Sequence, residues 1–286
     1  MDDQMITIYV LCDATLRALG HREDAQCQVS DAEIMTMALV SAQFFHGNFE
    51  TGCSVLQMMG YMPRRLSRSQ FNRRLHRLHQ RFVQLFSLLS QVWKQQQIEG
   101  TYVVDSFPIA ACDNIRIRRC RLYRDEVYRG YCASKRRYFY GLKRHLMITN
   151  QGQPIELFFA PGSLADVQTL QWFSVDLPPG SVVYADRAYT DYAIEDLLND
   201  ALQIRLLPVR KSNSKRPLPA HIHFVQTQQR KRVETTGSLI ERLLPRHIHA
   251  VTAKGFELKL LLFVLAYSVD CLEVTTWINY GRWIQL

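Results

Sequence analysis

The 286-residue sequence predicts an α/β protein, in which a mixed sheet with helices packed on it follows an all-helical region. Up to about residue 98, apolar residues recur every three or four positions, as they do in amphipathic helices. After Gly100 they form short β-branched and aromatic runs, which alternate with helical segments. The change of pattern predicts two domains, over residues 1–98 and 99–286.

The first region carries two helix signals. Ser30 and Glu33 have the spacing of a capping box, in which each side chain bonds a backbone amide of the other's turn. From Ser67 or Ser69 onward, apolar residues between Phe71 and Val92 recur at helical spacing. This second pattern predicts one long amphipathic helix.

The second region begins with Tyr102–Asp105, a short strand that ends on an acid. Two further strands, Tyr138–Ile148 and Pro154–Phe159, form a hairpin around residues 150–153. The remaining segments are a helix over Asp166–Phe173, a strand over Ser181–Asp186, a helix over Ala193–Leu198, a strand over Ile204–Val209, a loop over Lys211–Ala220, and helices over Gln228–Leu244 and Lys254–Cys271. Antiparallel strands followed by strand–helix alternation predict a mixed sheet.

Composition narrows the class of protein. An apolar fraction of 47% and a charged fraction of 21% exclude a disordered chain. A net charge of +9 favours a polyanionic partner such as nucleic acid. Met1 is followed by two acids rather than a basic leader, and Leu260–Val269 is too short to span a membrane. The seven cysteines include no C-x-x-C pair, so we expect reduced thiols in a cytoplasmic protein.

Two acids stand where apolar strand segments stop. Asp105 follows Tyr102–Val104, and Asp186 follows Ser181–Ala185. An ionised carboxylate at such a place needs a partner, because desolvation is costly. A metal ion is one partner, since Mg²⁺ favours a few carboxylates at a rim; a capped turn is the other interpretation.

In-line phosphoryl chemistry with two ions needs a third acid. Glu234, one helical turn after Arg230, is the candidate, and Glu241 is the alternative on nearly the same face. The non-catalytic interpretation of Glu234 is a surface ion pair with Arg230. The spaced histidines His221-x-His223 and His247-x-His249 fit a surface position better than a zinc site, because no cysteine or acid supports them.

Several segments together resemble those of DDE transposases of bacterial insertion sequences. They are Val103–Pro108, Ala160–Asp166, Tyr184–Tyr189, Arg230–Glu234 and, less specifically, Gly255–Lys259. The resemblance implies an RNase H-like fold for residues 99–286. It also implies that Asp105, Asp186 and Glu234 are the catalytic, metal-binding acids. Relatives often carry Tyr and Lys where this chain has Thr227 and Glu241, whereas Arg230 matches.

The activity that the resemblance implies is cleavage at the ends of an insertion sequence, followed by strand transfer to target DNA. Two Mg²⁺ ions, for which Mn²⁺ could substitute, would assist the chemistry. The partners would be terminal inverted repeats and target DNA, with a dimer joining two ends and the protein associated with the bacterial nucleoid. The alternatives are an RNase H-like nuclease without strand transfer, and a DNA-binding repressor or decayed transposase.

Basic residues predict where DNA binds, because Lys and Arg neutralise phosphates. For the helical first region, the alternatives are a base-reading helix that binds element ends and a structural helix with a basic face. For the basic cluster after residue 115, the alternative to DNA binding is a solvated loop. The candidates are Arg68, Asn72 and Arg73 in the first region, and Arg116, Arg118, Arg119, Arg136, Arg137, Lys143, Arg187, Arg210, Lys211 and Arg230 in the second.

Overall fold

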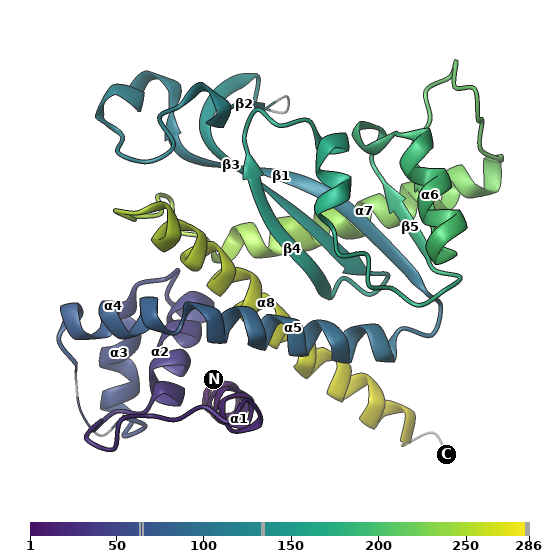
Figure 1. Cartoon of the computed structure of the whole chain (residues 1–286). Coiled ribbons are helices and arrows are strands. Elements are labelled where there is room, and N and C mark those ends of the chain that lie inside the picture. The colour runs from purple at the N-terminus through teal and green to yellow at the C-terminus, as the bar shows by residue number, and fades with distance from the viewer. Residues whose placement is uncertain (63, 65, 133–134, 284–286) are drawn as a thin grey trace. The chain divides into compact units, whose positions relative to one another are not determined.

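A computed structural model of the chain describes residues 1–62, 64, 66–132 and 135–283, without the side chains of residues 113, 114 and 273–283 (Figure 1). The chain divides into two compact units. One unit combines Met1–Leu89 with Leu239–Leu286, and the other is Ser90–Ser238. This division differs from the predicted boundary at residue 98, because the C-terminal helix packs with the N-terminal helices.

The first unit is all-helical. Its helices are α1 (Asp2–Ala18), α2 (Asp31–Phe44), α3 (Phe49–Met58), α4 (Arg68–Arg77), the start of α5 (His79–Gln96), the end of α7 (Ala220–Leu243) and α8 (Ala253–Trp283). Helix α2 contacts α1, α3, α4 and α8, and its residues Ala32 and Ile34–Ala42 are buried. Because α2 is surrounded, it is apolar around its whole circumference.

Two local predictions for this unit have different outcomes. The capping box at the start of α2 is confirmed, since Glu33 N donates to Ser30 Oγ and Ser30 N donates to Glu33 Oε2. The single long helix is wrong, because the chain turns at Leu78 between α4 and α5. Leu78 is buried, so the apolar periodicity continues through the turn and conceals it.

The second unit is built on a mixed sheet. Its strands are β1 (Thr101–Asp113), β2 (Arg129–Cys132), β3 (Arg137–Thr149), β4 (Pro154–Pro161), β5 (Val182–Ala185) and β6 (Arg205–Pro208). The order is β2-β3-β1-β5-β6, with β4 also paired to β3. Pairs among β1 to β4 are antiparallel, whereas β1, β5 and β6 run parallel. The predicted α/β class is confirmed, and the sheet is consistent with an RNase H-like fold.

Asp105 does not end its strand, which corrects the sequence prediction. Strand β1 continues to Asp113 because it pairs with β3 over that whole length. The parallel pairing of β1 with β5, however, stops at Val104 opposite Ala185. Asp105 and Asp186 are therefore the residues that follow the last pair, Val104 and Ala185, at the point where the chain leaves β5.

The connections of this unit are α6 (Tyr192–Leu202), the first part of α7, and the short helices η1 (Asn114–Arg119), η2 (Glu126–Tyr128), η3 (Asp166–Trp172) and η4 (Arg187–Tyr189). Helix α7 begins directly after Pro219, eight residues before the predicted start at Gln228. Its first turns expose polar residues such as His221 and His223, so they show no apolar periodicity.

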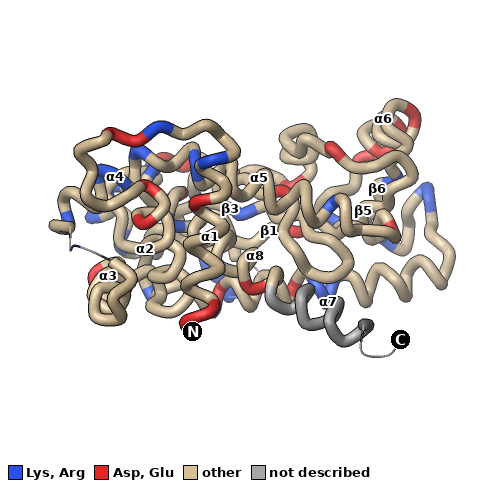
Figure 2. The backbone as a smooth tube through the Cα atoms, turned by 90° about the horizontal axis from the view of Figure 1, so that it is seen from below, with Lys and Arg blue, Asp and Glu red and all other residues tan. Residues whose placement is uncertain are grey.

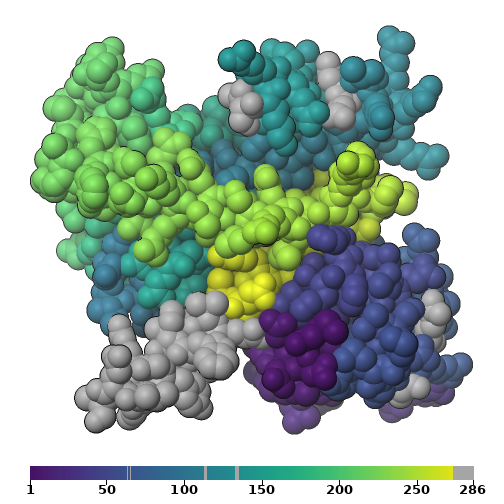
Figure 3. Space-filling view, turned by 180° about the vertical axis from the view of Figure 1, so that it is seen from behind, coloured from purple at the N-terminus to yellow at the C-terminus, as the bar shows by residue number. Residues whose placement is uncertain are grey.

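Helix α7 packs closely on β1. Val233, Thr236 and Gly237 are buried, and a Cβ at Gly237 would lie 2.2 Å from a ring carbon of Phe107. Thr236 Oγ1 also donates to Gly152 O in the hairpin loop. Lys231, Arg232 and Thr235 on the other side of α7 are exposed to solvent. The yellow-green segment that contains α7 lies on the surface seen in Figure 3. In the described part of the chain, no helix has the length and hydropathy that a bilayer crossing requires.

Candidate active site

The register of the two parallel strands brings Asp105 and Asp186 together. Val104 and Ala185 are partners, so each aspartate follows a paired, buried residue at the carboxyl end of the parallel pairing. Ser106 N donates to Asp105 Oδ1 at 2.8 Å, which holds the Asp105 carboxylate beside its own strand. Carboxyl ends of parallel strands are common places for ligand binding in open α/β sheets.

Arg230 connects Asp186 to Glu234. Its guanidinium lies 3.2 Å from Asp186 Oδ1 and 3.4 Å from Glu234 Oε1. Residues 230 and 234 are one helical turn apart on α7, which therefore presents both side chains toward the end of β5. Glu234 and Arg230 are partly open to solvent, with side-chain exposures of 55% and 39%. The three predicted acids thus belong to one surface of the second unit.

The ionisation of Asp105 is strongly perturbed by its surroundings. Burial raises the pKa of its carboxyl group from 3.8 to about 7, and the negative charges of Asp186 and Asp166 act in the same direction. The hydrogen bond from Ser106 N and the charge of Arg230 lower the pKa but do not compensate. A further positive charge at this place would favour the ionised carboxylate.

A fourth acid, Asp166, lies next to this group. Its carboxylate accepts from Ser106 Oγ at 2.8 Å and from Lys143 Nζ at 2.9 Å. Lys143 Nζ also donates to Leu164 O, so its ammonium group is engaged within the protein. The sequence contained a signal for Asp166, since it ends the motif Ala160–Asp166, but no role was predicted for it.

A buried hydrogen-bonded group supports the same strands from within. His145 Nδ1 lies 2.9 Å from Tyr189 Oη and 3.2 Å from Thr169 Oγ1, and the imidazole stacks on Phe158. Burial lowers the pKa of His145 to about 4, so the ring is neutral at pH 7. Tyr189 follows Asp186 in the η4 turn, and its pKa is raised by burial and by the nearby carboxylates.

Carboxylate chemistry at this site suits a hard divalent cation, which prefers oxygen ligands. The ligand atoms of Asp105, Asp186 and Glu234 do not all lie within 4.8 Å of one another, so a shared ion would require these side chains to approach. Among the described residues, the group that meets this distance is His21, Glu23 and Asp31 in the first unit. There, His21 and Arg74 pair with Asp31 at the start of α2, which gives these side chains a structural role.

Most of the basic residues predicted to bind DNA are exposed. Arg68 and Arg73 on α4 are exposed, and Asn72 is partly buried beside them. Figure 2 shows Lys and Arg positions along the backbone at α4. The exposed basic candidates in the second unit are Arg116, Arg118, Arg119, Arg136, Arg137, Arg187 and Lys211. Lys143 and Arg230 are engaged with the acids described above. Their exposure is consistent with contacts to phosphates.

Arg210 differs from this expectation. Its side chain is 4% exposed and forms a two-fold ion pair with Glu195, which is 7% exposed. The Arg210 guanidinium also lies 5.1 Å from the centre of the Tyr192 ring. Because Arg210 neutralises a buried carboxylate between β6 and α6, it is not available to a DNA phosphate. A basic sequence pattern cannot distinguish this position from an exposed one.

A mixed sheet with one acid within its central strand, a second acid after the neighbouring parallel strand and a third on a following helix is consistent with an RNase H-like fold. Residues 95–246, slightly more than half of the chain, match the family described as the transposase DDE domain. The chain therefore belongs to the DDE transposase domain family and is a DNA transposase. DDE transposase domains are DNA-cleaving enzymes that use divalent metal ions.

Among solved structures, the chain is similar to a cryo-EM structure of the piggyBac transposase synaptic complex with hairpin DNA. The TM-score is 0.47 and the sequence identity is 12%, over 94% of this chain and 72% of that chain. Comparison with curated proteins gives no match.

Proposed function

We propose that Asp105, Asp186 and Glu234 are the catalytic acids of this transposase, and that they hold two Mg²⁺ ions during strand cleavage and strand transfer. The observation that carries this assignment is the pair of contacts from Arg230 to Asp186 and Glu234 beside Asp105. Glu234 is favoured over Glu241 because Arg230 pairs with Glu234, and Glu241 lies beyond the end of this unit.

The chemistry divides between the ions and the side chains. Bound Mg²⁺ ions would activate the attacking oxygen and stabilise the leaving 3′ oxygen of an in-line displacement. Ser106 N orients the Asp105 carboxylate, and the Asp166–Lys143 ion pair supports the adjacent turn. Arg230 holds Asp186 and Glu234 toward each other.

The acids are tested by isosteric substitution. Asp105→Asn, Asp186→Asn and Glu234→Gln should each reduce cleavage of an end-labelled DNA fragment carrying the element end by at least about a hundredfold, because each removes a negative ligand. DNA binding should be retained. Glu241→Gln is the matched control on the same helix and should cleave normally. If Glu234→Gln cleaves normally and Glu241→Gln does not, the third acid is Glu241.

Strand transfer is tested separately from cleavage. A pre-cleaved element end with a free 3′-hydroxyl should be joined to a supercoiled plasmid in the presence of Mg²⁺. A nuclease without strand transfer would cut DNA but leave this end unjoined. Joining by the wild-type chain and its loss in Asp105→Asn would identify the same acids in both steps.

The first unit is proposed to bind the ends of an insertion sequence. Ser67 caps α4, Gln70 closes the capping box, and Arg68 and Arg73 are exposed on the helix. Arg and Asn side chains on such a helix have the donors that read base edges. Because two ends must be joined, we expect two copies of the chain in the complex. Light scattering with and without paired end fragments measures this stoichiometry.

A further inference from the structure

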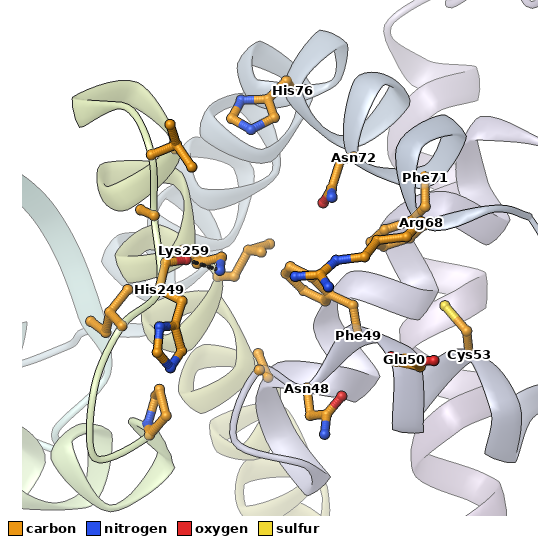
Figure 4. Close-up of a pocket in the computed structure, with 18 of the residues that line it drawn as sticks. Asn48, Phe49, Glu50, Cys53, Arg68, Phe71, Asn72, His76, His249 and Lys259 are labelled. Atoms are coloured by element: carbon orange, nitrogen blue, oxygen red, sulfur yellow. Dashed lines mark hydrogen bonds between the residues drawn. The ribbon is translucent and has the colours of Figure 1, made fainter. Parts of the chain in front are cut away.

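A cavity of about 660 Å³ lies within the helical first unit (Figure 4). Its walls come from α3, α4, the start of α8 and residues 245–252 before α8. All of its lining residues belong to this unit, whereas the catalytic acids belong to the other. The volume is in the range of sites that enclose small organic ligands. The catalytic assignment therefore does not account for this cavity.

Two cations reach into the cavity from opposite sides. Figure 4 shows Arg68 on α4 directed across the cavity toward α8, whereas the ammonium group of Lys259 on α8 is directed to His249. Lys259 Nζ donates to His249 O, yet neither Lys259 nor Arg68 forms an ion pair with a carboxylate among the described residues. Burial and the charge of Arg68 both lower the pKa of Lys259. Two cations that line one cavity favour an anion bound there.

The beginnings of α4 and α8 add to this positive potential, whereas Glu50 in the first turn of α3 offsets that of the third helix at the cavity. The cavity is lined by Asn48 and Phe49 at the start of α3, by Ser67 and Arg68 at the start of α4, and by Thr252 before α8. Neither α4 nor α8 has an acidic residue in its first turn. Backbone amides in a first helical turn attract anions, and phosphate groups in particular.

Aromatic rings form another part of the wall. The rings of Phe49 and Phe71 lie 5.2 Å apart between centroids, at an angle of 53°. Lys259 Nζ lies 5.6 Å from the centre of the Phe49 ring, so the aromatic surface adjoins the cations. A ligand that suits both features carries a flat, unpaired ring next to a phosphate. Nucleotides have this chemistry, and bases stack readily on aromatic side chains.

We propose that this cavity binds one unpaired nucleotide of a DNA strand, with the phosphate between Arg68 and Lys259 and the base against Phe49 and Phe71. The proposal rests on the transposase function, which brings DNA to the protein. A duplex end would supply this nucleotide by fraying or unstacking. Asn72 supplies an amide donor and acceptor that can meet the edge of the base.

The test measures binding of the full chain to fluorescent DNA by anisotropy. The probes are a short single-stranded oligonucleotide, a blunt duplex of the same sequence and, as competitor, the free mononucleotide dTMP. Lys259→Gln and Arg68→Gln should each weaken single-strand binding about tenfold, because each removes a charged hydrogen bond to phosphate. Each should also reduce the slope of log affinity against log salt concentration by about 1.

Control variants separate a specific site from general basic charge. Lys259→Arg keeps the charge and should retain binding. Phe49→Leu should weaken single-strand binding by about tenfold and leave blunt-duplex binding unchanged, because it removes a stacking surface but no charge. Arg17→Gln removes a surface charge outside the cavity and should bind like the wild type. Thermal melting by circular dichroism verifies that each variant is folded.

Three results would overturn the proposal. One is wild-type binding of the single strand by both charge variants. Another is an equal loss for duplex and single strand with no effect of Phe49→Leu, which would make the cations general phosphate contacts. The last is tight binding of dTMP with no effect of the variants on DNA, which would assign the cavity to a free nucleotide. Loss of cleavage in Asp105→Asn is independent of all three and tests the catalytic function alone.

Discussion

At the level of single residues, burial and neighbouring charges determine which ionisable groups contribute to function and which to stability. Asp105 has a pKa raised to about 7 by burial and by nearby carboxylates, whereas its ordinary value is 3.8. Between these pH values the folded state binds more protons at this group than the unfolded state does. The contribution of Asp105 to stability is therefore present at low pH and is lost as the pH rises toward 7.

The direction of this pH dependence of stability gives a test of the Asp105 environment. As the pH rises from about 4 to about 7, Asp105→Asn should gain stability relative to the wild type, and the gain should reach about 4 kcal/mol at pH 8. Urea unfolding at several pH values measures the difference, because other titrating groups are common to both proteins. A difference that does not change with pH would mean that Asp105 titrates normally.

Arg210 and Arg216 provide a matched comparison of buried and exposed ion pairs. Both guanidiniums lie over the Tyr192 ring, at 5.1 Å and 4.8 Å from its centre. Arg210 pairs with buried Glu195, whereas Arg216 pairs with Asp196 at exposures of 47% and 55%. The same residue type therefore has two different energetic roles on one small surface.

Arg210→Met should destabilise the chain by roughly 3–5 kcal/mol, because it leaves a buried carboxylate without its partner. Arg216→Met should cost less than about 1 kcal/mol, since its ion pair is exposed. Urea unfolding measures both free energies. Folded Arg210→Met should bind DNA with the affinity of the wild type. A clear loss of affinity would mean that Arg210 contacts DNA.

At the level of secondary-structure elements, the candidate active site depends on how closely β1 and β3 approach each other. Gly141 on β3 lies opposite Ala110, where the pairing with β1 is irregular between Ala110 and Cys112. A Cβ at position 141 would lie 2.2 Å from Ile109 O and 2.8 Å from Ala111 N. Backbone atoms cannot turn away as a side chain can, so a side chain here must displace β1.

Gly141→Ala should therefore destabilise the chain by about 2 kcal/mol or more and reduce cleavage, because β1 carries Asp105. Gly255→Ala is the control. Its Cβ would meet the tip of the His76 side chain at 3.0 Å, so a cost below about 1 kcal/mol is expected. Equal melting temperatures for Gly141→Ala and the wild type would show that the strands separate easily.

At the level of the whole molecule, recognition of element ends by α4 and catalysis are assigned to different units. The proposed DNA-end contacts of α4 belong to Met1–Leu89, and the acids belong to Ser90–Ser238. The net charge of +9 favours DNA whether or not metal is bound. The two activities should therefore respond differently to removal of divalent ions.

Chelation with EDTA should abolish cleavage and leave binding of element ends within about twofold, because binding relies on Lys and Arg contacts to phosphate. Re-addition of Mg²⁺ or Mn²⁺ should restore cleavage. Electrophoretic mobility shift and cleavage measured on the same DNA fragment distinguish these effects. Loss of binding on chelation would instead place the metal in the DNA-binding surface.

The sequence alone was sufficient for the fold class and for the capping box at Ser30 and Glu33. Both depend on local information, namely the period of apolar residues and the spacing of polar side chains. The transposase family was likewise evident from short motifs around Asp105, Asp186 and Glu234, and the match over residues 95–246 confirms it. The catalytic role of these acids is still a prediction.

Other features depended on contacts between distant segments, which local patterns do not report. The turn at Leu78 is hidden by burial, and α8 joins the N-terminal helices only because its apolar surface covers α2. The position of Asp105 beside Asp186 follows from the register of two strands about eighty residues apart in sequence, and the engagement of Arg210 follows from a carboxylate on another element. Only tertiary packing determines such registers and burial, because their free energy comes from surfaces that meet after the chain has folded.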